Sequence, residues 1–207
     1  MSLPLDMQGV PRKARLYLGI SGGLDSAYLA WRLLSMGHPL LLHHCTYRTT
    51  QQRWPHEETA YRAILDWLTA QGLTDWTLLT TEVDLNGTAG YWLLDYEYLW
   101  WVAGIHLRNR NRRDVKHLVV PSHAESRSVR DRTFRRMYET LSRTAERSIT
   151  PIYPMARYDR PQIIGDMPSE LVEMCWWCRS PRDGEPCHEC ATCKVVDGAF
   201  EVLRRVA

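Results

Sequence analysis

The chain has 207 residues, 44% of them hydrophobic, which is enough for one sizeable α/β domain with a small appendage. Its formal net charge of +2 does not by itself indicate a nucleic-acid partner. The longest apolar runs are only as long as strands, and the first 19 residues lack the apolar segment of a signal peptide, so we expect a cytoplasmic protein without a membrane span.

The first predicted strand, Arg15–Ile20, leads into the segment S-G-G-L-D-S at residues 21–26. Adjacent glycines let the backbone approach an anion, and the first N–H groups of a following helix point toward it. Ser21 and Ser26 add hydroxyl donors. Asp25 would repel a bare anion, but it fits a site in which Mg²⁺ lies between carboxylate and phosphate oxygens. The segment therefore predicts a nucleotide polyphosphate site, with a tight corner capped by Ser26 as the structural alternative.

This loop is not of the Walker type, because the lysine of that pattern is absent. The elements after it alternate between predicted helices and predicted strands. Helices are expected at Ser26–Met36, His56–Ala70, Gly90–Leu107 and Val129–Arg143, and strands at Pro39–Tyr47, Trp76–Leu85, His117–Pro121 and Ile149–Tyr153. This alternation predicts an α/β fold with a doubly wound parallel sheet, whose ligand lies beyond the carboxyl ends of the strands.

Twelve basic residues lie between positions 108 and 147. A solvated surface with ordinary ion pairs is the favoured interpretation of this segment. A docking surface for RNA is the alternative.

Prolines and cysteines dominate after residue 156, which indicates a first domain over 1–156 and a compact appendage over 157–207. Cysteines in this part form three overlapping C-x₂-C pairs, at positions 175, 178, 187, 190 and 193. Thiolates at such spacing predict a closed structural zinc site, which needs four ligands. Five cysteines compete for these places, and His188 is a sixth candidate. An iron–sulfur cluster, a reactive thiol and free buried cysteines are the alternatives.

Together, the S-G-G-x-D-S loop and the later C-x₈-C-x₂-C-x₂-C pattern resemble those of the 7-cyano-7-deazaguanine synthases (QueC), a family of PP-loop ATP pyrophosphatases. The resemblance implies an adenine nucleotide alpha hydrolase-like domain with a zinc-binding appendage, and a homodimer. It implies that ATP is bound by Ile20, Ser21, Gly22, Gly23, Leu24, Asp25 and Ser26. It also implies that Zn²⁺ is bound by Cys178, Cys187, Cys190 and Cys193, which leaves Cys175 as the spare cysteine.

The chemistry that the resemblance implies is activation of a carboxylate. ATP with Mg²⁺ adenylates 7-carboxy-7-deazaguanine, pyrophosphate leaves, and ammonia displaces AMP to give an amide. A second ATP then activates the amide oxygen, and loss of AMP gives the nitrile. Ser21, Asp25 and Ser26 are the loop residues expected to take part in catalysis.

The chain departs from the family pattern in the walls of the expected site. Tyr47 and His56 are the nearest matches to the family's Y-G-Q-R-H, so we expect both to bind substrate. The family's A-N-A-E-D appears as S-H-A-E-S, which makes His123 a substrate-binding candidate and Glu125 a catalytic one. The family's V-P-G-R-N is missing.

A family lysine is replaced by Arg157 or Arg160, either of which could bind the phosphates of ATP but could not give up a proton. These departures leave open which amine accepts the activated acyl group. The enzyme could stop at the amide, or couple the activated carboxylate to another amine, as in a phage or defence modification.

Two further hypotheses remain. The first is a tRNA-modifying PP-loop enzyme, which the basic segment would support, although nucleic acid is not the partner we favour. The second is a non-catalytic nucleotide-binding module with a zinc knuckle. Retention of the motif's Ser21, Asp25 and Ser26 argues against that module, because a binding module has no need of the metal-binding acid.

Overall fold

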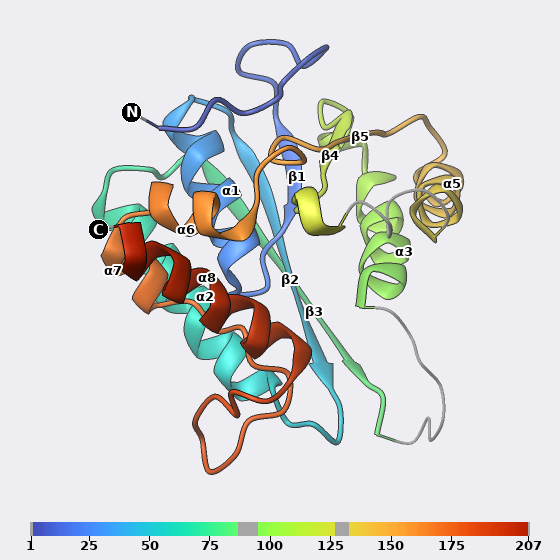
Figure 1. Ribbon diagram of the computed structural model, residues 1–207. Coiled ribbons are helices and arrows are strands. Elements are labelled where there is room, and N and C mark those ends of the chain that lie inside the picture. The colour runs from blue at the N-terminus through green and yellow to red at the C-terminus, as the bar shows by residue number, and fades with distance from the viewer. Residues whose placement is uncertain (1, 87–94, 127–132, 207) are drawn as a thin grey trace.

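The computed structural model describes residues 2–86, 95–126 and 133–206 (Figure 1). Five parallel strands form one sheet in the order β3-β2-β1-β4-β5. The strands are β1 (Leu16–Gly19), β2 (Leu40–Arg48), β3 (Trp76–Asp84), β4 (His117–Val119) and β5 (Thr150–Ile152). The predicted parallel sheet is confirmed, and each predicted strand differs from the observed one by no more than two residues at an end.

Helices connect the strands, as the alternation predicted. They are α1 (Leu24–Ser35), α2 (Trp54–Ala70), α3 (Asp95–Leu107), α5 (Thr133–Ala145), α6 (Arg160–Asp166), α7 (Ser169–Glu173) and α8 (Ala191–Val206), with short 3₁₀ turns η1 (Arg110–Arg112) and η2 (Ala124–Ser126). The starts predicted for two of these helices, at positions 90 and 129, lie outside the described residues. The α2 helix begins two residues earlier than predicted, because a proline is well tolerated in the first turn of a helix.

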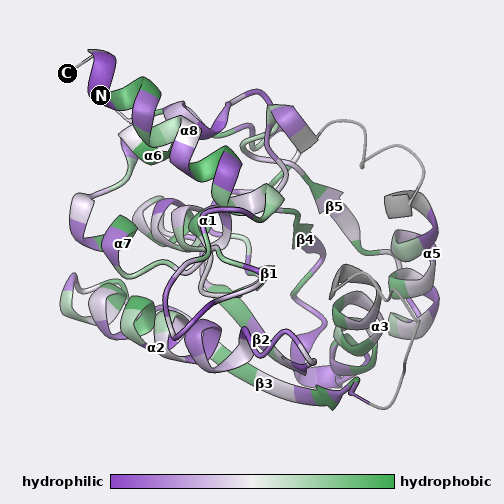
Figure 2. Ribbon diagram, turned by 60° about the horizontal axis from the view of Figure 1, so that its bottom comes forward, coloured by the Kyte–Doolittle hydropathy of each residue, from purple (hydrophilic) through white to green (hydrophobic). Residues whose placement is uncertain are grey.

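The central strands are buried on both faces, because successive side chains of a strand point to opposite sides of the sheet. On β1, Leu16 and Leu18 pack with α1, α2, α6, α7 and α8, whereas Tyr17 packs with α3 and α5. Figures 1 and 2 show these two groups of helices on opposite sides of the sheet. The fold is therefore doubly wound, and the order of the strands reverses between β1 and β4.

The C-terminal segment packs into the larger of the two cores. Tyr158 and Leu171 are buried in the same cluster as residues of α1 and β1. Asp166 of α6 accepts a hydrogen bond from Tyr28 at 2.9 Å and pairs with the Arg32 guanidinium at 2.5 Å. The stretches 1–156 and 157–207 thus share one core, and their division into two domains stays a prediction.

None of the helices in the described part of the chain has the length and the hydropathy that crossing a membrane requires.

Candidate active site and cysteine cluster

The phosphate-loop motif lies where β1 ends and α1 begins, at the carboxyl edge of the sheet. Gly22 has a φ of +82°, and a Cβ built there would lie 2.8 Å from the carbonyl oxygen of Glu57. Glycine is therefore required both by the backbone conformation and by the close approach of α2.

Hydrogen bonds within the loop fix its shape. The Gly23 N–H donates to Ser21 Oγ at 3.2 Å, and the Ser26 hydroxyl donates to the Gly23 carbonyl at 3.0 Å. The helix cap is Gly23, without a side-chain hydrogen bond, so Ser26 is not the capping residue that the structural alternative required.

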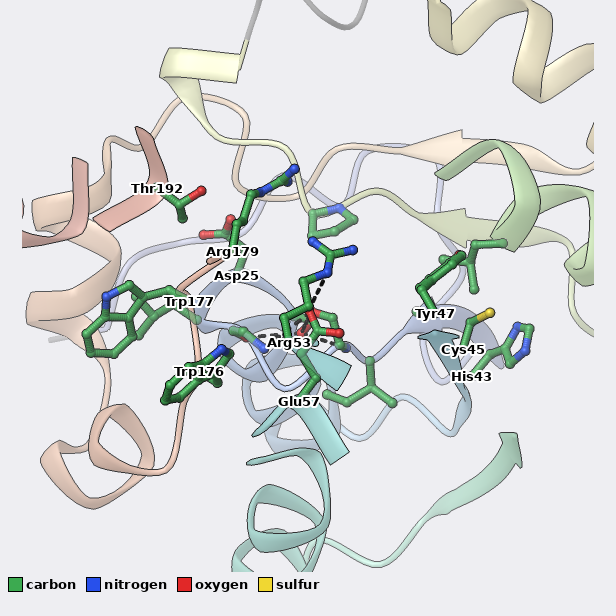
Figure 3. Close-up of a pocket in the computed structure, with 18 of the residues that line it drawn as sticks. Asp25, His43, Cys45, Tyr47, Arg53, Glu57, Trp176, Trp177, Arg179 and Thr192 are labelled. Atoms are coloured by element: carbon green, nitrogen blue, oxygen red, sulfur yellow. Dashed lines mark hydrogen bonds and ion pairs between the residues drawn. The ribbon is translucent and has the colours of Figure 1, made fainter. Parts of the chain in front are cut away.

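A pocket opens beside this loop (Figure 3). Besides the loop, its walls come from β2, the end of β4, helix α3, the starts of α2, α6 and α8, and the segment that carries the cysteines. Lining residues from these elements are His43, Cys45, Tyr47, Arg53, Glu57, Leu99, Trp100, Val119, Pro121, Arg160, Trp176, Trp177, Cys178, Arg179 and Thr192. In Figure 3, Trp176 and Trp177 lie on one side, His43, Cys45 and Tyr47 on the other, and Arg53 and Glu57 between them.

Asp25 is held by a buried guanidinium. Its Oδ2 accepts a hydrogen bond from Arg160 Nη2 at 3.1 Å. The same Nη2 donates to Nε2 of His123 at 2.9 Å, so that ring nitrogen carries no proton. His123 Nδ1 lies 3.0 Å from a carboxylate oxygen of Glu125. Asp25, Arg160, His123 and Glu125 thus form a chain of contacts from the pocket outward.

The other carboxylate oxygen of Asp25, Oδ1, is buried without a hydrogen-bond partner among the described residues. A buried carboxylate oxygen without a partner is costly unless a ligand completes its coordination. Oxygen donors are the ligands that Mg²⁺ prefers. Asp25, together with the hydroxyls of Ser21 and Ser26, therefore fits a magnesium ion bound with a phosphate.

The structure brings most of the predicted nucleotide-binding residues together. Residues of that set that line the pocket are Ile20, Ser21, Gly23, Leu24, Asp25, Ser26 and Arg160, and Tyr47, predicted to bind substrate, lines it too. Gly22 instead faces α2. Arg157 is exposed and pairs with Asp6 at 3.1 Å, so of the two candidate arginines only Arg160 reaches the pocket.

The remaining predicted residues lie around the pocket. The His56 ring stacks on Trp176 with centroids 4.2 Å apart and an interplanar angle of 12°. His123 and Glu125 lie behind Arg160.

Several pocket residues have no counterpart in the sequence prediction. Arg53 and Glu57 form a largely buried ion pair at 3.4 Å near the start of α2. Trp176, Trp177 and Arg179 come from the cysteine-rich segment, which the sequence assigned only to metal binding. The one available signal was their position next to Cys178, since residues that flank a metal ligand are held in place by it.

Four cysteines converge beside this wall. The Sγ atoms of Cys178, Cys187, Cys190 and Cys193 all lie within 4.8 Å of one another. Backbone N–H groups donate to these sulfurs, for example from Cys187 to Cys178 at 3.2 Å and from Cys190 to Cys187 at 3.3 Å. Such donors stabilise thiolates, the form that binds metal.

The pKa values follow from these contacts. The N–H groups of Glu189 and Cys190 lower the pKa of the Cys187 thiol. Burial opposes ionisation of Cys190, but the N–H groups of Arg179 and Cys193 and the thiols of Cys193 and Cys187 together outweigh burial and lower the pKa of Cys190 to about 6. Burial raises the pKa of the Cys178 and Cys193 thiols above the usual value. The four sulfurs fit a single tetrahedral ion, because thiolates on the separate irons of a cubane cluster lie farther apart.

The two remaining candidate ligands lie elsewhere. Cys175 is buried, its thiol donates to the Leu171 carbonyl at 3.1 Å, and burial raises its pKa well above the usual value. His188 Nδ1 lies 2.9 Å from a carboxylate oxygen of Asp197. Neither side chain belongs to the group of converging sulfurs.

Comparison with known proteins shows the fold. No family model matches the sequence, and neither does any curated protein. The structure of NMN synthetase from Francisella tularensis matches with a TM-score of 0.50 and 12% identity, over 95% of this chain and 81% of that chain. An α/β fold is therefore shared with that synthetase.

Two other solved structures match with lower TM-scores. The U34-tRNA thiolase NcsA from Methanococcus maripaludis, with its [4Fe-4S] cluster, has a TM-score of 0.48 and 12% identity, over 96% of this chain and 74% of that chain. The NAD⁺ synthetase from Burkholderia pseudomallei has a TM-score of 0.34 and 15% identity, over 93% of this chain and 81% of that chain.

Proposed function

We propose that this chain is an ATP-dependent ligase of the PP-loop type, which converts a carboxylate into an acyl adenylate and releases pyrophosphate. The observation that carries this proposal is the carboxylate of Asp25. It lines the pocket beside a glycine- and serine-rich loop, with one buried oxygen that lacks a partner among the described residues. A carboxylate in a phosphate-binding loop serves metal-bound phosphate, since it would repel the phosphate alone.

In this proposal the chain's own residues position the reactants and neutralise charge. Loop N–H groups and the hydroxyls of Ser21 and Ser26 bind the phosphates, and Asp25 would hold Mg²⁺, which neutralises charge on the departing pyrophosphate. Arg160 fixes the orientation of Asp25 through the hydrogen bond to Oδ2. His123 and Glu125 support Arg160 from behind, so we assign them to the positioning of this group.

We further propose that the activated carboxylate is that of 7-carboxy-7-deazaguanine and that ammonia is the acceptor, giving 7-cyano-7-deazaguanine. Support comes from the order of the two motifs, and from the aromatic side chains around the pocket. Tyr47, Trp100 and Trp176 offer flat apolar surface, as a planar base requires. A product left at the amide, or coupled to a different amine, is the alternative, because the substrate walls differ most from the family pattern.

We assign Zn²⁺ to the four cysteines. Their sulfurs converge at the spacing of one ion, and backbone donors favour the thiolate forms of Cys187 and Cys190. Zinc in such a closed site has a structural role. It would fix the segment that forms one wall of the pocket.

The basic segment does not favour RNA as the substrate. Residues 108–116 precede β4 and so lie at the amino edge of the sheet, opposite the pocket. Arg108 pairs with Glu146, and Arg147 donates to the carbonyls of Arg112 and Arg113 at 2.8 and 2.9 Å. We therefore propose an enzyme that acts on a small molecule. A cytoplasmic location and a homodimer are further proposals, the second of which follows from the resemblance alone.

The test is mass spectrometry of a reaction that contains the protein, 7-carboxy-7-deazaguanine, ATP, Mg²⁺ and ammonium. The nitrile together with AMP and pyrophosphate is the expected result. The amide alone would support the alternative acceptor chemistry. Absence of AMP and pyrophosphate with this substrate and with other carboxylates would contradict the adenylating function.

A further inference from the structure

Three guanidinium groups line the pocket, and two of them are matched by a carboxylate. Arg53 pairs with Glu57, and Arg160 pairs with Asp25. Arg179, by contrast, has no carboxylate within 4.0 Å among residues 2–86, 95–126 and 133–206. The pocket therefore holds one positive charge that no acid of the described chain neutralises.

The segment that carries Arg179 lies directly against the phosphate loop. The Trp176 N–H donates to the Gly22 carbonyl at 2.9 Å. The Trp176 carbonyl oxygen lies 3.5 Å from the position that a Cβ on Gly23 would occupy. This close contact brings residues 176–179 to the place where the loop would receive phosphate.

The backbone on the other side of this contact is fixed by the cysteines. Arg179 directly follows Cys178, whose sulfur accepts a hydrogen bond from the Cys187 N–H at 3.2 Å. The guanidinium is thus attached to a backbone held at both ends, by the loop and by the cysteine cluster. A side chain supplied from such a rigid segment loses less entropy when it binds a ligand.

The loop itself supplies no cation. In Walker-type loops a lysine reaches the β- and γ-phosphates, and the S-G-G-L-D-S loop lacks it. The charge of Arg160 is already balanced by Asp25. A bound Mg·ATP keeps net negative charge, which needs a further donor in the same place.

We propose that Arg179 is the residue that binds the β- and γ-phosphates of ATP, supplied by the cysteine-rich segment in place of a loop lysine. This inference rests on the proposed function, because it needs ATP in the pocket. An arginine suits the role, because its planar donors match two phosphate oxygens at once.

The same guanidinium could instead bind the carboxylate of the substrate that is to be adenylated, and the experiment distinguishes this carboxylate from the phosphates of ATP. Calorimetry would measure the dissociation constants of α,β-methylene-ATP with Mg²⁺, and of AMP, for the wild type and for Arg179→Gln and Arg179→Lys. The matched control is Arg182→Gln. Arg182 comes from the same segment, is exposed, pairs with Glu189 at 2.6 Å and does not line the pocket.

We expect Arg179→Gln to raise the dissociation constant of the ATP analogue about tenfold or more, as loss of a charge-assisted hydrogen bond implies. Arg179→Lys should keep part of the affinity. AMP has no β- or γ-phosphate, so its affinity should stay within about twofold, as should the affinity of Arg182→Gln for both ligands. Thermal melting of each variant checks that the fold is kept.

An equal loss of affinity for AMP and for the ATP analogue would overturn the inference, as would an equal loss in Arg182→Gln. Unchanged affinity for the ATP analogue with a raised KM for the carboxylate substrate would assign Arg179 to that carboxylate and would also overturn the inference. A wild-type protein that binds no Mg·ATP analogue would contradict the proposed function itself, which is a separate failure.

Discussion

At the scale of single residues, the site depends on how the two carboxylate oxygens of Asp25 are used, one for a contact within the protein and the other for a ligand. Asp25 uses one oxygen for Arg160 and leaves the other without a described partner. The sequence indicated that Asp25 serves a metal, because the motif places an acid among phosphate donors. It did not indicate which arginine would meet it, since Arg157 and Arg160 are only three residues apart and only the start of α6 decides which one turns inward.

Asp25→Asn should reduce Mg²⁺-dependent pyrophosphate release by about a hundredfold or more while the fold survives. The amide keeps the shape of the side chain but loses the charge that binds the metal. Stability should fall by only about 1–2 kcal/mol, because Arg160 loses a charged partner. Pyrophosphate release and thermal melting measure the two effects.

Asp6→Asn is the matched control, since Asp6 pairs with an arginine on the surface. Its turnover should equal that of the wild type. Full Mg²⁺-dependent activity in Asp25→Asn would show that the acid is not a metal ligand.

His43 makes stability depend on pH. Burial, together with the nearby His106, His44 and Arg112, lowers the pKa of His43 to about 3, below the value of about 6.5 expected in the unfolded chain. The unfolded state therefore binds more protons between these two values, so the contribution of His43 to stability is complete above pH 6.5 and is lost as the pH falls toward 3.

Between pH 7.5 and pH 5.5 this residue alone should cost about 1.4 kcal/mol of unfolding free energy. Urea denaturation at several pH values measures the slope, and His43→Asn should flatten it. Between pH 7.5 and 9 the substitution should leave the slope unchanged. An equally steep fall below pH 6.5 in the variant would assign the dependence to other groups.

At the scale of elements, the loop and the start of α2 fit together with no space to spare. At Gly22 an added Cβ would meet the Glu57 carbonyl at 2.8 Å, whereas at Gly9, which has a similar φ of +77°, it would meet nothing within 4 Å. Alanine at Gly9 therefore tests the cost of backbone strain alone, whereas alanine at Gly22 adds the cost of a steric contact.

Gly22→Ala should destabilise the protein by about 1–3 kcal/mol and abolish ATP binding, because α2 or the loop must shift. Gly9→Ala should cost only about 1 kcal/mol and leave ATP binding intact. Denaturation and nucleotide titration compare the two. If the two substitutions changed stability and ATP binding equally, α2 would adjust to the added Cβ at Gly22 without cost.

The cysteine cluster is the second element whose role is open to direct test. We expect about one zinc per chain by metal analysis, as four thiolate ligands imply. Cys178→Ser should lose the metal and loosen the wall of the pocket, whereas Cys175→Ser should keep the metal, since Cys175 bonds to the Leu171 carbonyl instead.

Limited proteolysis of both variants would report on residues 176–193 directly. The opposite behaviour of the two cysteines would show that the ligand set is wrong. Iron found by metal analysis, together with a brown colour of the protein, would show that the site holds an iron–sulfur cluster instead of zinc.

At the scale of the whole molecule, the sequence predicted the sheet well because each strand and helix carries its own local signal, either a periodicity or a continuous apolar run. The strand Leu40–Arg48 is read from its own residues, and so is the phosphate loop. Contacts between distant parts have no such local signal. Trp176 meets Gly22 only because α6, α7 and α8 pack onto α1 and α2, which no short pattern reveals.

The basic residues of segment 108–116 and the pocket lie at opposite edges of the sheet. Replacing Arg110 and Arg113 by glutamate should leave turnover of a small substrate within about twofold, because both residues lie at the amino edge of the sheet. Turnover kinetics and retention of tRNA on a filter at rising salt measure the two possible roles. Salt-dependent retention of tRNA by the wild type that this variant loses would favour an RNA substrate.

The hydrogen bond between Trp176 and Gly22 joins the first loop of the fold to one of its last segments. A ribosome makes proteins from the amino end, so the phosphate loop is synthesised well before the segment around Trp176 that forms one wall of the pocket. No nascent chain that ends before Trp176 can form the complete pocket. The last wall of the pocket is therefore added only after the cysteine segment has left the ribosome.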